Sequence, residues 1–423
     1  MAPLKVLIVG GGVAGPALAH WLSRTGASIT LIERSPQIRA SGQQLDLRAQ
    51  GVPMMKKMGI EPAVRAVGVH ETGTQFIDTS GQTKAFFPAV QSGSGRQSIT
   101  SEYEIMRGDL VHILYGLTET SPNVKHVFNT TVDTLTQDDE SDPAGKVHVG
   151  FNDGTKQDYD LVVGADGTGS RTRKLMLGPD APDPRHHQGG YIGFFSIPSK
   201  PGDSDRFTFF HLPGRWIGTR QDNPELTRIY MYTDDKNAAL DAAHESRDLA
   251  ELKKAWGDIF QGEGWECDRF MKGLKDAPEA DDLYSTPFVQ VRLPEGSWSK
   301  GRVALIGDAA HSGTANGIGT TWALVGAYIL AGEIAALQSM GESSAAVVQG
   351  AKNYEARFRP IATALHGQKD YGQRLMAPRS SLGIWLLHSA AKAMAYLQLE
   401  QRVGLDKKTA SWALPEYPEL VSQ

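Results

Sequence analysis

The start of the chain contains the feature that most constrains the fold: a strand, a glycine-rich turn, a helix and a second strand. The apolar run from Leu4 to Val9 predicts a buried strand, and residues from Ala14 to Thr25 follow a helical pattern. A second apolar run over Ser28–Ile32 predicts the next strand. Two strands joined by such a crossover helix lie parallel in one sheet. We therefore expect an α/β fold.

The turn between the first strand and the helix has the pattern G-x-G-x-x-G. In such turns Gly10 permits the tight bend, Gly12 lets a pyrophosphate approach the backbone, and Gly15 allows close helix packing. Glu33 ends the second strand, where a carboxylate can accept hydrogen bonds from an adenosine ribose and would repel the 2′-phosphate of NADP. A turn that merely permits packing would leave this acid unexplained. The predicted dinucleotide site here comprises Gly10, Gly12, Val13, Ala14, Gly15, Glu33 and Arg34.

Composition limits the partners and the compartment. The net charge of −5 argues against nucleic acid as a partner, and a single cysteine, Cys267, cannot form an internal disulfide or a cysteine-based metal cluster. The apolar stretch from Gly383 to Leu399 includes His388 and Lys392 and is short for a membrane span. It predicts a docking helix, with an amphipathic membrane-surface or partner-binding helix as the alternative. We expect no membrane span and a reducing, cytoplasmic location.

The segments Val124–Val132 and Lys146–Asn152 each predict one strand. The acidic run Asp138–Asp142 between them predicts a solvated hairpin tip.

The middle of the chain changes character. Aromatic-rich strands with Pro-Gly and Asn-Pro turns between Gln188 and Asp234 predict an antiparallel sheet inserted into the α/β domain. Residues 241–275 and the C-terminal third, from Thr320, follow helical patterns. The predicted division assigns 1–73, 99–180 and 283–340 to a dinucleotide-binding domain, 74–98 and 181–282 to a substrate domain, and 341–423 to a C-terminal helical segment.

Two further segments carry glycines and acids at predicted strand ends. Asp160–Gly167 is followed by Ser170 and Arg173, and Gly307–His311 is followed by Gly317-Ile318-Gly319. With these, the chain resembles the class A FAD-dependent monooxygenases of the para-hydroxybenzoate hydroxylase type over essentially its whole length. Further segments that carry the resemblance are Glu104–Leu110, Tyr354-Glu355 and Arg359-Pro360, and Gly42–Leu47 is most similar to tetracycline-inactivating monooxygenases.

The resemblance implies a Rossmann-like domain with non-covalent FAD and assigns roles to individual residues. It places Asp308 on the ribityl chain of FAD and Arg107 near the phosphate or ribityl region. It makes Asp166 the bridge between FAD and a nicotinamide nucleotide. Backbone N–H groups of the segment Gly317–Thr321, among them those of Gly319 and Thr320, and the positive end of its helix would face the pyrimidine edge of the flavin. The alternatives are a helix cap for Asp308, a surface ion pair for Arg107 and a simple turn at Asp166.

This sequence departs from the family at the third glycine-rich segment. Thr314-Ala315 and Thr320-Thr321 stand where the family has a proline and a Gly-x-Gly-x-Asn ending, and Val325-Gly326-Ala327 replaces an Asp-Ala. These changes affect the expected contacts to the isoalloxazine ring.

The resemblance implies an enzyme that uses NAD(P)H and O₂ to hydroxylate an aromatic, enolic or polyketide-like small molecule through a flavin C4a-hydroperoxide. A flavin-dependent dehydrogenase or reductase without oxygen transfer, and a non-catalytic FAD-binding protein, are the alternatives. No catalytic acid or base is assigned; the candidates in the inserted sheet are Tyr191, His211 and Arg220. No metal site is expected, because the pair His186-His187 is interpreted as a loop. No oligomeric state is predicted.

The inserted strands contain more aromatic residues than an isolated sheet needs, among them Phe194, Phe195, Phe207, Phe209, Phe210, Trp216 and Tyr230. All of them could pack beneath the helices of residues 241–275. Alternatively, one face of the sheet could form the apolar wall of a substrate cavity opposite the flavin.

Overall fold

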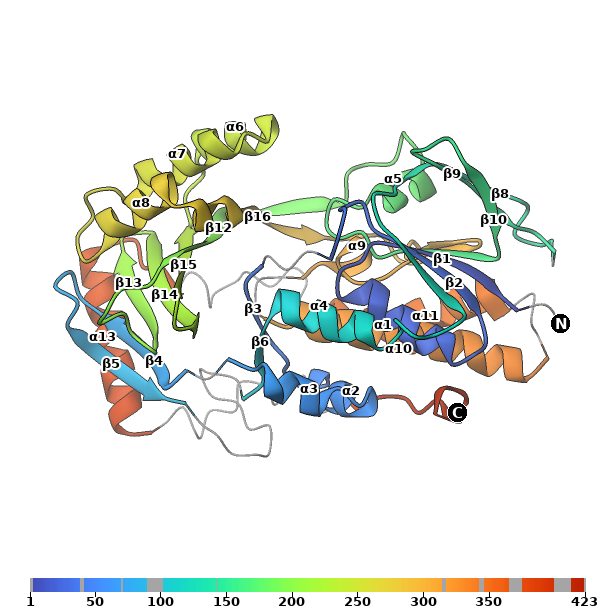
Figure 1. Ribbon diagram of the computed structural model, residues 1–423, viewed down its shortest axis with the longest axis horizontal. Helices are drawn as coiled ribbons and strands as arrows, with labels where there is room; N and C mark the ends of the chain where they lie inside the picture. The colour runs from blue at the N-terminus through green and yellow to red at the C-terminus, as the bar shows by residue number, and fades with distance from the viewer. Residues whose placement is uncertain are drawn as a thin grey trace.

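The computed structural model describes residues 3–38, 42–69, 71–89, 102–142, 144–313, 317–341, 346–364, 375–398 and 412–421. Figure 1 shows two units side by side, each built on its own large sheet, with the N-terminus in one of them.

The first unit contains a six-stranded sheet with the predicted βαβ start at its centre. Its strand order is β17-β18-β11-β1-β2-β7, parallel throughout except for β17. The strands are β1 (Lys5–Val9), β2 (Ser28–Ile32), β7 (Val124–Val127), β11 (Leu161–Gly164), β17 (Ser299–Lys300) and β18 (Val303–Leu305). The fold prediction is confirmed here: β1 is buried from Val6 to Val9, and neighbours flank it on both sides.

Helices cover this sheet and bury its apolar side chains. They are α1 (Ala14–Ser23), α4 (Arg107–Gly116), α5 (Arg171–Leu177), α9 (Asp308–His311), α10 (Gly319–Ser339) and α11 (Ala346–Ala362), with α2 (Gly51–Lys57), α3 (Glu61–Ala66) and the 3₁₀ turn Pro418–Leu420 at the edge. By length and composition α10 could cross a membrane, but 83% of its most apolar window is buried inside the protein. It packs against α1 and α11 as a core helix.

A single strand was predicted over Val124–Val132, and this prediction is wrong. The chain bends at Asn129, whose φ of 55° is left-handed, and divides the segment between two sheets. β7 pairs with β2, whereas β8 (Val132–Gln137) joins a three-stranded sheet with β9 (Val147–Phe151) and β10 (Lys156–Tyr159). The acidic run from Asp138 lies at the exposed tip of the β8–β9 hairpin, as expected.

The second unit contains a seven-stranded sheet in the order β16-β12-β15-β14-β13-β4-β5. Its strands are β4 (Gly73–Ile77), β5 (Thr83–Pro88), β12 (Arg185–Pro198), β13 (Phe207–Leu212), β14 (Arg215–Asn223), β15 (Leu226–Thr233) and β16 (Tyr284–Val291). The predicted antiparallel sheet is confirmed, with one difference: β13 and β4 are parallel. Residues 186 and 187, interpreted as a loop, belong to β12 and pair with β16.

One face of this sheet is covered by α6 (Ala238–Ser246), α7 (Leu249–Phe260), α8 (Cys267–Asp276) and the 3₁₀ helix Pro278–Asp282 (Figure 1). Phe195 and Phe210 pack there with Trp256. Phe209 belongs to a different cluster, with Phe76 and Ala391, on the opposite face. The aromatic residues therefore do not all lie beneath the helices, because alternate residues of a strand point to opposite faces.

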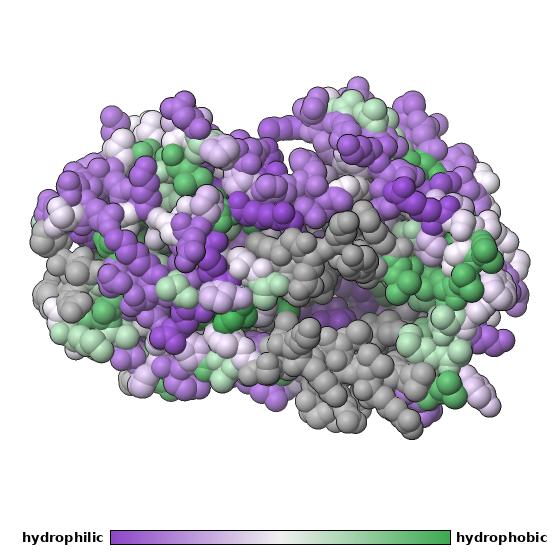
Figure 2. All heavy atoms as spheres, turned by 180° about the vertical axis from the view of Figure 1, so that it is seen from behind, coloured by the Kyte–Doolittle hydropathy of each residue, from purple (hydrophilic) through white to green (hydrophobic). Residues whose placement is uncertain are grey.

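The predicted docking helix is α13 (Ser381–Tyr396), which packs through Ala391 on β5 and β13. Its outer side chains remain accessible, with Trp385 62% and Leu386 54% exposed. In the view from behind, hydrophobic side chains gather on the side of the molecule that α13 occupies (Figure 2).

A short antiparallel ribbon lies between the two units. It consists of β3 (Gln44–Asp46) and β6 (Glu104–Met106), with Gln44 opposite Met106. Figure 1 shows this ribbon between the large sheets, next to the start of α4. It brings residues of the first unit close to the face of the seven-stranded sheet that α6–α8 leave uncovered.

Candidate functional site

The glycine-rich turn after β1 is held by contacts that exclude larger side chains. Gly10 has φ 115°, and a Cβ there would lie 2.5 Å from the carbonyl oxygen of Ala165. A Cβ on Gly15 would lie 2.0 Å from the carbonyl oxygen of Gly10. Gly12 differs, since of the described residues only the Arg107 guanidinium would come within 4 Å of a Cβ there. The backbone at Gly12 thus borders open space beside a cation, as an approaching pyrophosphate requires.

Glu33 lies at the end of β2 and is only 8% exposed. One carboxylate oxygen accepts the N–H of Gly11 at 2.8 Å, and the other accepts the N–H of Ser35 at 2.9 Å. The carboxylate therefore shapes the turn, at the strand end where an adenosine ribose is expected. Burial, and secondarily the charge of Glu33, raise the pKa of the neighbouring Tyr115. Arg34, the next residue, is exposed.

Arg107 and Asp308 come from different elements and lie close enough to interact electrostatically. Arg107 begins α4, and its aliphatic stem would lie 3.0 Å from a Cβ on Gly42. Asp308 begins α9 after Gly307, whose φ is 58°. Its side chain is accessible to solvent, although protein atoms surround it closely. This crowding raises the pKa of Asp308, and Arg107 opposes the rise.

Asp166 is engaged within its own loop. Its carboxylate accepts the hydroxyl of Ser170 and both the N–H (2.9 Å) and the hydroxyl (3.0 Å) of Thr172. Asp166 thus fastens the turn that leads into α5, which is the contact expected from the simpler alternative.

Arg173 is a residue whose role the sequence pattern did not reveal. Its guanidinium is buried and donates to the carbonyls of Ala309, at 2.8 Å, and Thr168, at 2.6 Å. It therefore connects the loop after β11 to the segment that carries Asp308.

Gly319 and Thr320 begin α10, whose N-cap residue is Ile318. Gly319 is exposed and Thr320 is half-buried. The next residue, Thr321, donates its hydroxyl to the carbonyl of Arg48 at 2.9 Å and so joins α10 to the chain that follows β3. The substituted pair Thr314-Ala315 lies outside the described residues.

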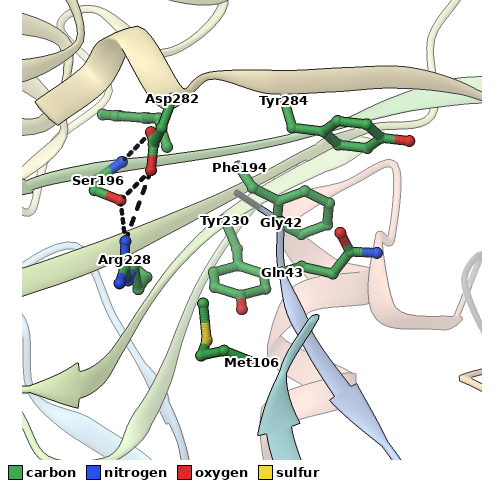
Figure 3. A pocket seen from close by; sticks show the side chains of 10 residues that line it. Gly42, Gln43, Met106, Phe194, Ser196, Arg228, Tyr230, Asp282 and Tyr284 are labelled. Atoms are coloured by element: carbon green, nitrogen blue, oxygen red, sulfur yellow. Dashed lines mark hydrogen bonds and ion pairs between the residues drawn. The ribbon is translucent and has the colours of Figure 1, made fainter. Parts of the chain in front are cut away.

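A pocket opens between the ribbon and the face of the seven-stranded sheet opposite α6–α8 (Figure 3). It is open to solvent on one side and is lined by Gly42, Gln43, Met106, Phe194, Phe195, Ser196, Arg228, Tyr230, Asp282 and Tyr284. One end is aromatic, because the rings of Phe194 and Tyr230 meet edge-on with centroids 4.7 Å apart. The other end is polar: Ser196 donates to Asp282 at 2.5 Å and accepts from Arg228.

Comparisons with known proteins agree with this arrangement. A family model described as an FAD binding domain matches residues 3–185. The flavin-dependent monooxygenase eupH of Phoma sp is 43% identical over 99% of this chain and 98% of its own length. This chain belongs to the FAD-dependent monooxygenases. The FAD-dependent monooxygenase asL4 of Sarocladium schorii is 38% identical over the full length of both proteins.

Solved structures show the same fold. The tetracycline destructase Tet(51) superimposes with a TM-score of 0.75 at 28% identity, over 98% of this chain and 100% of that one. Klebsiella pneumoniae HpxO, solved with FAD and uric acid, gives a TM-score of 0.70 at 17% identity, over 96% and 97% of the two chains. These comparisons confirm the prediction that this chain is an enzyme of the class A family, and FAD is the cofactor of the chain.

The structure gives each of the three candidate acids or bases of this monooxygenase another partner. Tyr191 donates its hydroxyl to Asp241 of α6, on the helix-covered face. Burial, and then the charge of His388, lower the pKa of His211 to about 3; the two imidazoles face each other between β13 and α13. Arg220 is engaged by two carboxylates. None of the three candidates is among the residues that line the pocket of Figure 3.

No group of three or more metal-ligating side chains occurs in the part of the chain that the structure describes. His311 packs against Trp298 and Phe358 inside the core.

Proposed function

We propose that this monooxygenase binds FAD through Gly10, Gly12, Val13, Ala14, Gly15, Glu33, Arg34, Arg107, Asp166, Asp308, Gly319 and Thr320. The open backbone at Gly12 beside the Arg107 guanidinium suits the pyrophosphate, and the accessible carboxylate of Asp308 suits a ribityl hydroxyl. When bound, FAD would take electrons from NAD(P)H and activate O₂ as a C4a-hydroperoxide, the chemistry that the protein itself lacks.

We further propose that the substrate is a small aromatic, enolic or polyketide-like molecule held in the pocket between the ribbon and the sheet. The observation that carries this proposal is the position of the pocket: Met106, which lines it, directly precedes Arg107 of the FAD cleft. Aromatic walls with a few polar groups at one end suit a flat ring bearing hydroxyl or carbonyl groups. Ser196, Arg228 and Asp282 would orient these polar substituents.

The proposed reaction consumes one O₂ and one NAD(P)H, places one oxygen atom on the substrate and releases the other as water. The protein has to hold the ring against the flavin and exclude bulk water, so that one oxygen atom is transferred to the substrate instead of being released as H₂O₂. We also propose that the substrate domain, predicted as 74–98 and 181–282, extends to Val291, because β16 pairs with β12 in its sheet. A cytoplasmic location remains part of the proposal.

The test is a screen of phenolic and polyketide compounds for accelerated NAD(P)H consumption by the FAD-loaded protein. For a compound that accelerates it, product formed under ¹⁸O₂ is expected to carry one labelled oxygen atom. Accelerated oxidation with no label in the product would instead indicate a dehydrogenase. Tight FAD binding with no NAD(P)H oxidation under any condition would indicate a non-catalytic binding protein.

A further inference from the structure

A buried cluster of three charged residues joins the two units beside the ribbon. The Arg220 guanidinium, on β14, donates two hydrogen bonds of 2.6 Å to the two carboxylate oxygens of Glu71. It also donates to the carboxylate of Glu104. The three side chains are at most 8% exposed. We call these residues the Arg220 cluster.

The two carboxylates lie where the chain passes from one unit to the other. Glu71 belongs to the connection from α3 to β4, on the way into the seven-stranded sheet. Glu104 begins β6, on the way back. The N–H of Val69 also bonds to the carbonyl of Glu104 at 2.8 Å, so the two passages run side by side. Arg220 thus connects the seven-stranded sheet to both of the chain segments that pass between the two units.

Two aromatic rings of the seven-stranded sheet also hold the guanidinium in place. It lies 4.2 Å from the ring centroid of Phe207 and 5.8 Å from that of Tyr230. Burial alone would lower the pKa of Arg220, but the charges of Glu104 and Glu71 outweigh burial and hold this pKa well above its ordinary value. The arginine is therefore a permanent cation in a single position.

A second contact holds the other strand of the ribbon. The hydroxyl of Tyr230 accepts the backbone N–H of Gln44 at 3.1 Å, and it lies 3.3 Å from the Gln44 side-chain oxygen. Gln44 is on β3 and Glu104 is on β6, so the seven-stranded sheet contacts both strands. The same ribbon leads directly to Arg107, because β6 ends at Met106.

Stability alone does not account for such a cluster. Taking charges out of water costs free energy, and replacing a buried ion group by apolar side chains of similar volume is often neutral or stabilising. A planar guanidinium that bonds several oxygens does, however, define direction as well as distance. The cluster is well suited to set the position of one unit relative to the other.

We propose that Arg220 is a positioning residue for oxygen transfer: through Glu104 it sets where the ribbon and Arg107 lie relative to the aromatic pocket. This inference rests on the proposed function of the pocket and the FAD cleft. Arg220 does not touch the substrate. It fixes the position of the substrate wall relative to the flavin site. Small displacements at this joint would leave both sites intact and misalign them.

The test replaces the whole cluster by apolar residues, Arg220→Met with Glu71→Leu and Glu104→Leu, which leaves no charge buried without a partner. We expect this variant to fold, to keep its thermal midpoint and to bind FAD. Its kcat should fall about tenfold or more, with KM changed less than threefold, because misalignment acts on the reacting geometry. The fraction of NAD(P)H electrons recovered as H₂O₂ should rise, and the visible spectrum of the bound flavin should shift.

A matched control removes an ion pair of the same sheet unit away from the ribbon, Arg269→Met with Asp203→Leu, whose side chains lie 2.7 Å apart in the native protein. This control should keep native kcat, coupling and flavin spectrum. If the cluster variant folds and also keeps all three native values, the proposal is overturned and the cluster is structural.

If the cluster variant does not fold, Arg220→Lys decides the question. Lysine keeps the positive charge but cannot reproduce the planar fork to two carboxylates. Loss of coupling with native FAD content supports positioning, and native coupling overturns it. Failure of the proposed function would be visible separately, as a wild-type protein that shows no substrate-stimulated NAD(P)H oxidation; the shift in flavin spectrum would then still test the cluster.

Discussion

Individual carboxylates in the proposed FAD site bind the protein backbone. Glu33 accepts two backbone N–H groups, and Asp166 accepts three hydrogen bonds from the loop that leads into α5. A charged acceptor bonded in this way is held in place before the ligand arrives. Preorganisation of this kind lowers the entropy lost on binding.

The first prediction at this scale concerns Glu33→Gln. Each carboxylate oxygen of Glu33 accepts a backbone N–H. In glutamine one of these oxygens is replaced by an NH₂ group, which cannot accept a hydrogen bond, so one of the two bonds is lost. Loss of a hydrogen bond to a charged group costs about 1.5–3 kcal/mol, so FAD affinity should fall about tenfold to a hundredfold. Fluorescence titration with FAD measures it. The control is Asp160→Asn, which alters another carboxylate bonded to a backbone N–H, at Lys5, and should leave the affinity unchanged.

The second prediction concerns acid stability. The buried His211 has its pKa lowered to about 3, whereas an unfolded chain takes up this proton near pH 6.5. Between these values the unfolded state binds more protons, so the free energy of unfolding falls as the pH drops below 6.5, by about 1.4 kcal/mol per pH unit for this residue. Urea unfolding of His211→Leu at pH 7, 6 and 5 should show a shallower decline than wild type. Identical slopes would contradict the assignment.

At the scale of elements, β12 shows how one strand serves two purposes. Phe194 and Phe195 are adjacent and both line the pocket, but only Phe195 also belongs to the buried cluster beneath the helices α7 and α8. Because side chains alternate along the strand, the ring of Phe195 packs in the core and the ring of Phe194 points to the opposite face.

This pair permits a matched test. Phe195→Ala should lower the free energy of unfolding by about 3–5 kcal/mol, because it leaves a cavity in a packed core. Phe194→Ala should cost much less stability and instead raise the yield of H₂O₂ per NAD(P)H, with FAD content unchanged. Chemical denaturation and a peroxide assay measure the two effects. Native coupling in Phe194→Ala would remove this ring from the proposed substrate wall.

Two glycines in helices give the next prediction. In Gly15→Ala the new methyl group would lie 2.0 Å from the Gly10 carbonyl oxygen, so α1 must move, and both stability and FAD binding should fall. Gly257 lies inside α7, and a Cβ there would meet none of the described residues within 4 Å. Gly257→Ala should therefore stabilise the protein by up to about 1 kcal/mol. Thermal melts of the two variants should shift in opposite directions.

On the scale of the whole molecule, the proposed FAD site is assembled from segments far apart in the sequence. Gly12, Arg107 and Asp308 come together there from three parts of the chain, so a bound cofactor would connect β1, α4 and α9. Ligands that bind only the folded state stabilise it by mass action.

We therefore expect removal of FAD to lower the thermal midpoint. FAD supplied at a hundred times its dissociation constant should restore about 2.7 kcal/mol of stability. The measurement is a melting curve of stripped protein over a range of FAD concentrations. A midpoint independent of FAD concentration would contradict a cofactor cleft that spans these elements.

Local sequence patterns were sufficient to predict those parts of the structure that depend on neighbouring residues. The strands Lys5–Val9 and Ser28–Ile32, the need for glycine at positions 10 and 15, and Glu33 at a strand end are consequences of short-range periodicity and turn geometry. The family resemblance added the cofactor class. The strand predicted across Asn129 failed because a left-handed residue divides it between two sheets, which is a tertiary effect.

Tertiary structure alone decided which polar residues remain available for chemistry. Tyr191, His211 and Arg220 carry reactive groups in the sequence, yet Asp241, His388 and the pair Glu71 and Glu104 engage them in the fold. The pocket likewise requires Gly42 and Tyr284, which lie more than two hundred positions apart, to meet. Periodicity determines which face of an element is apolar, but only packing determines what that face meets, because contacts between distant segments leave no regular spacing in the sequence.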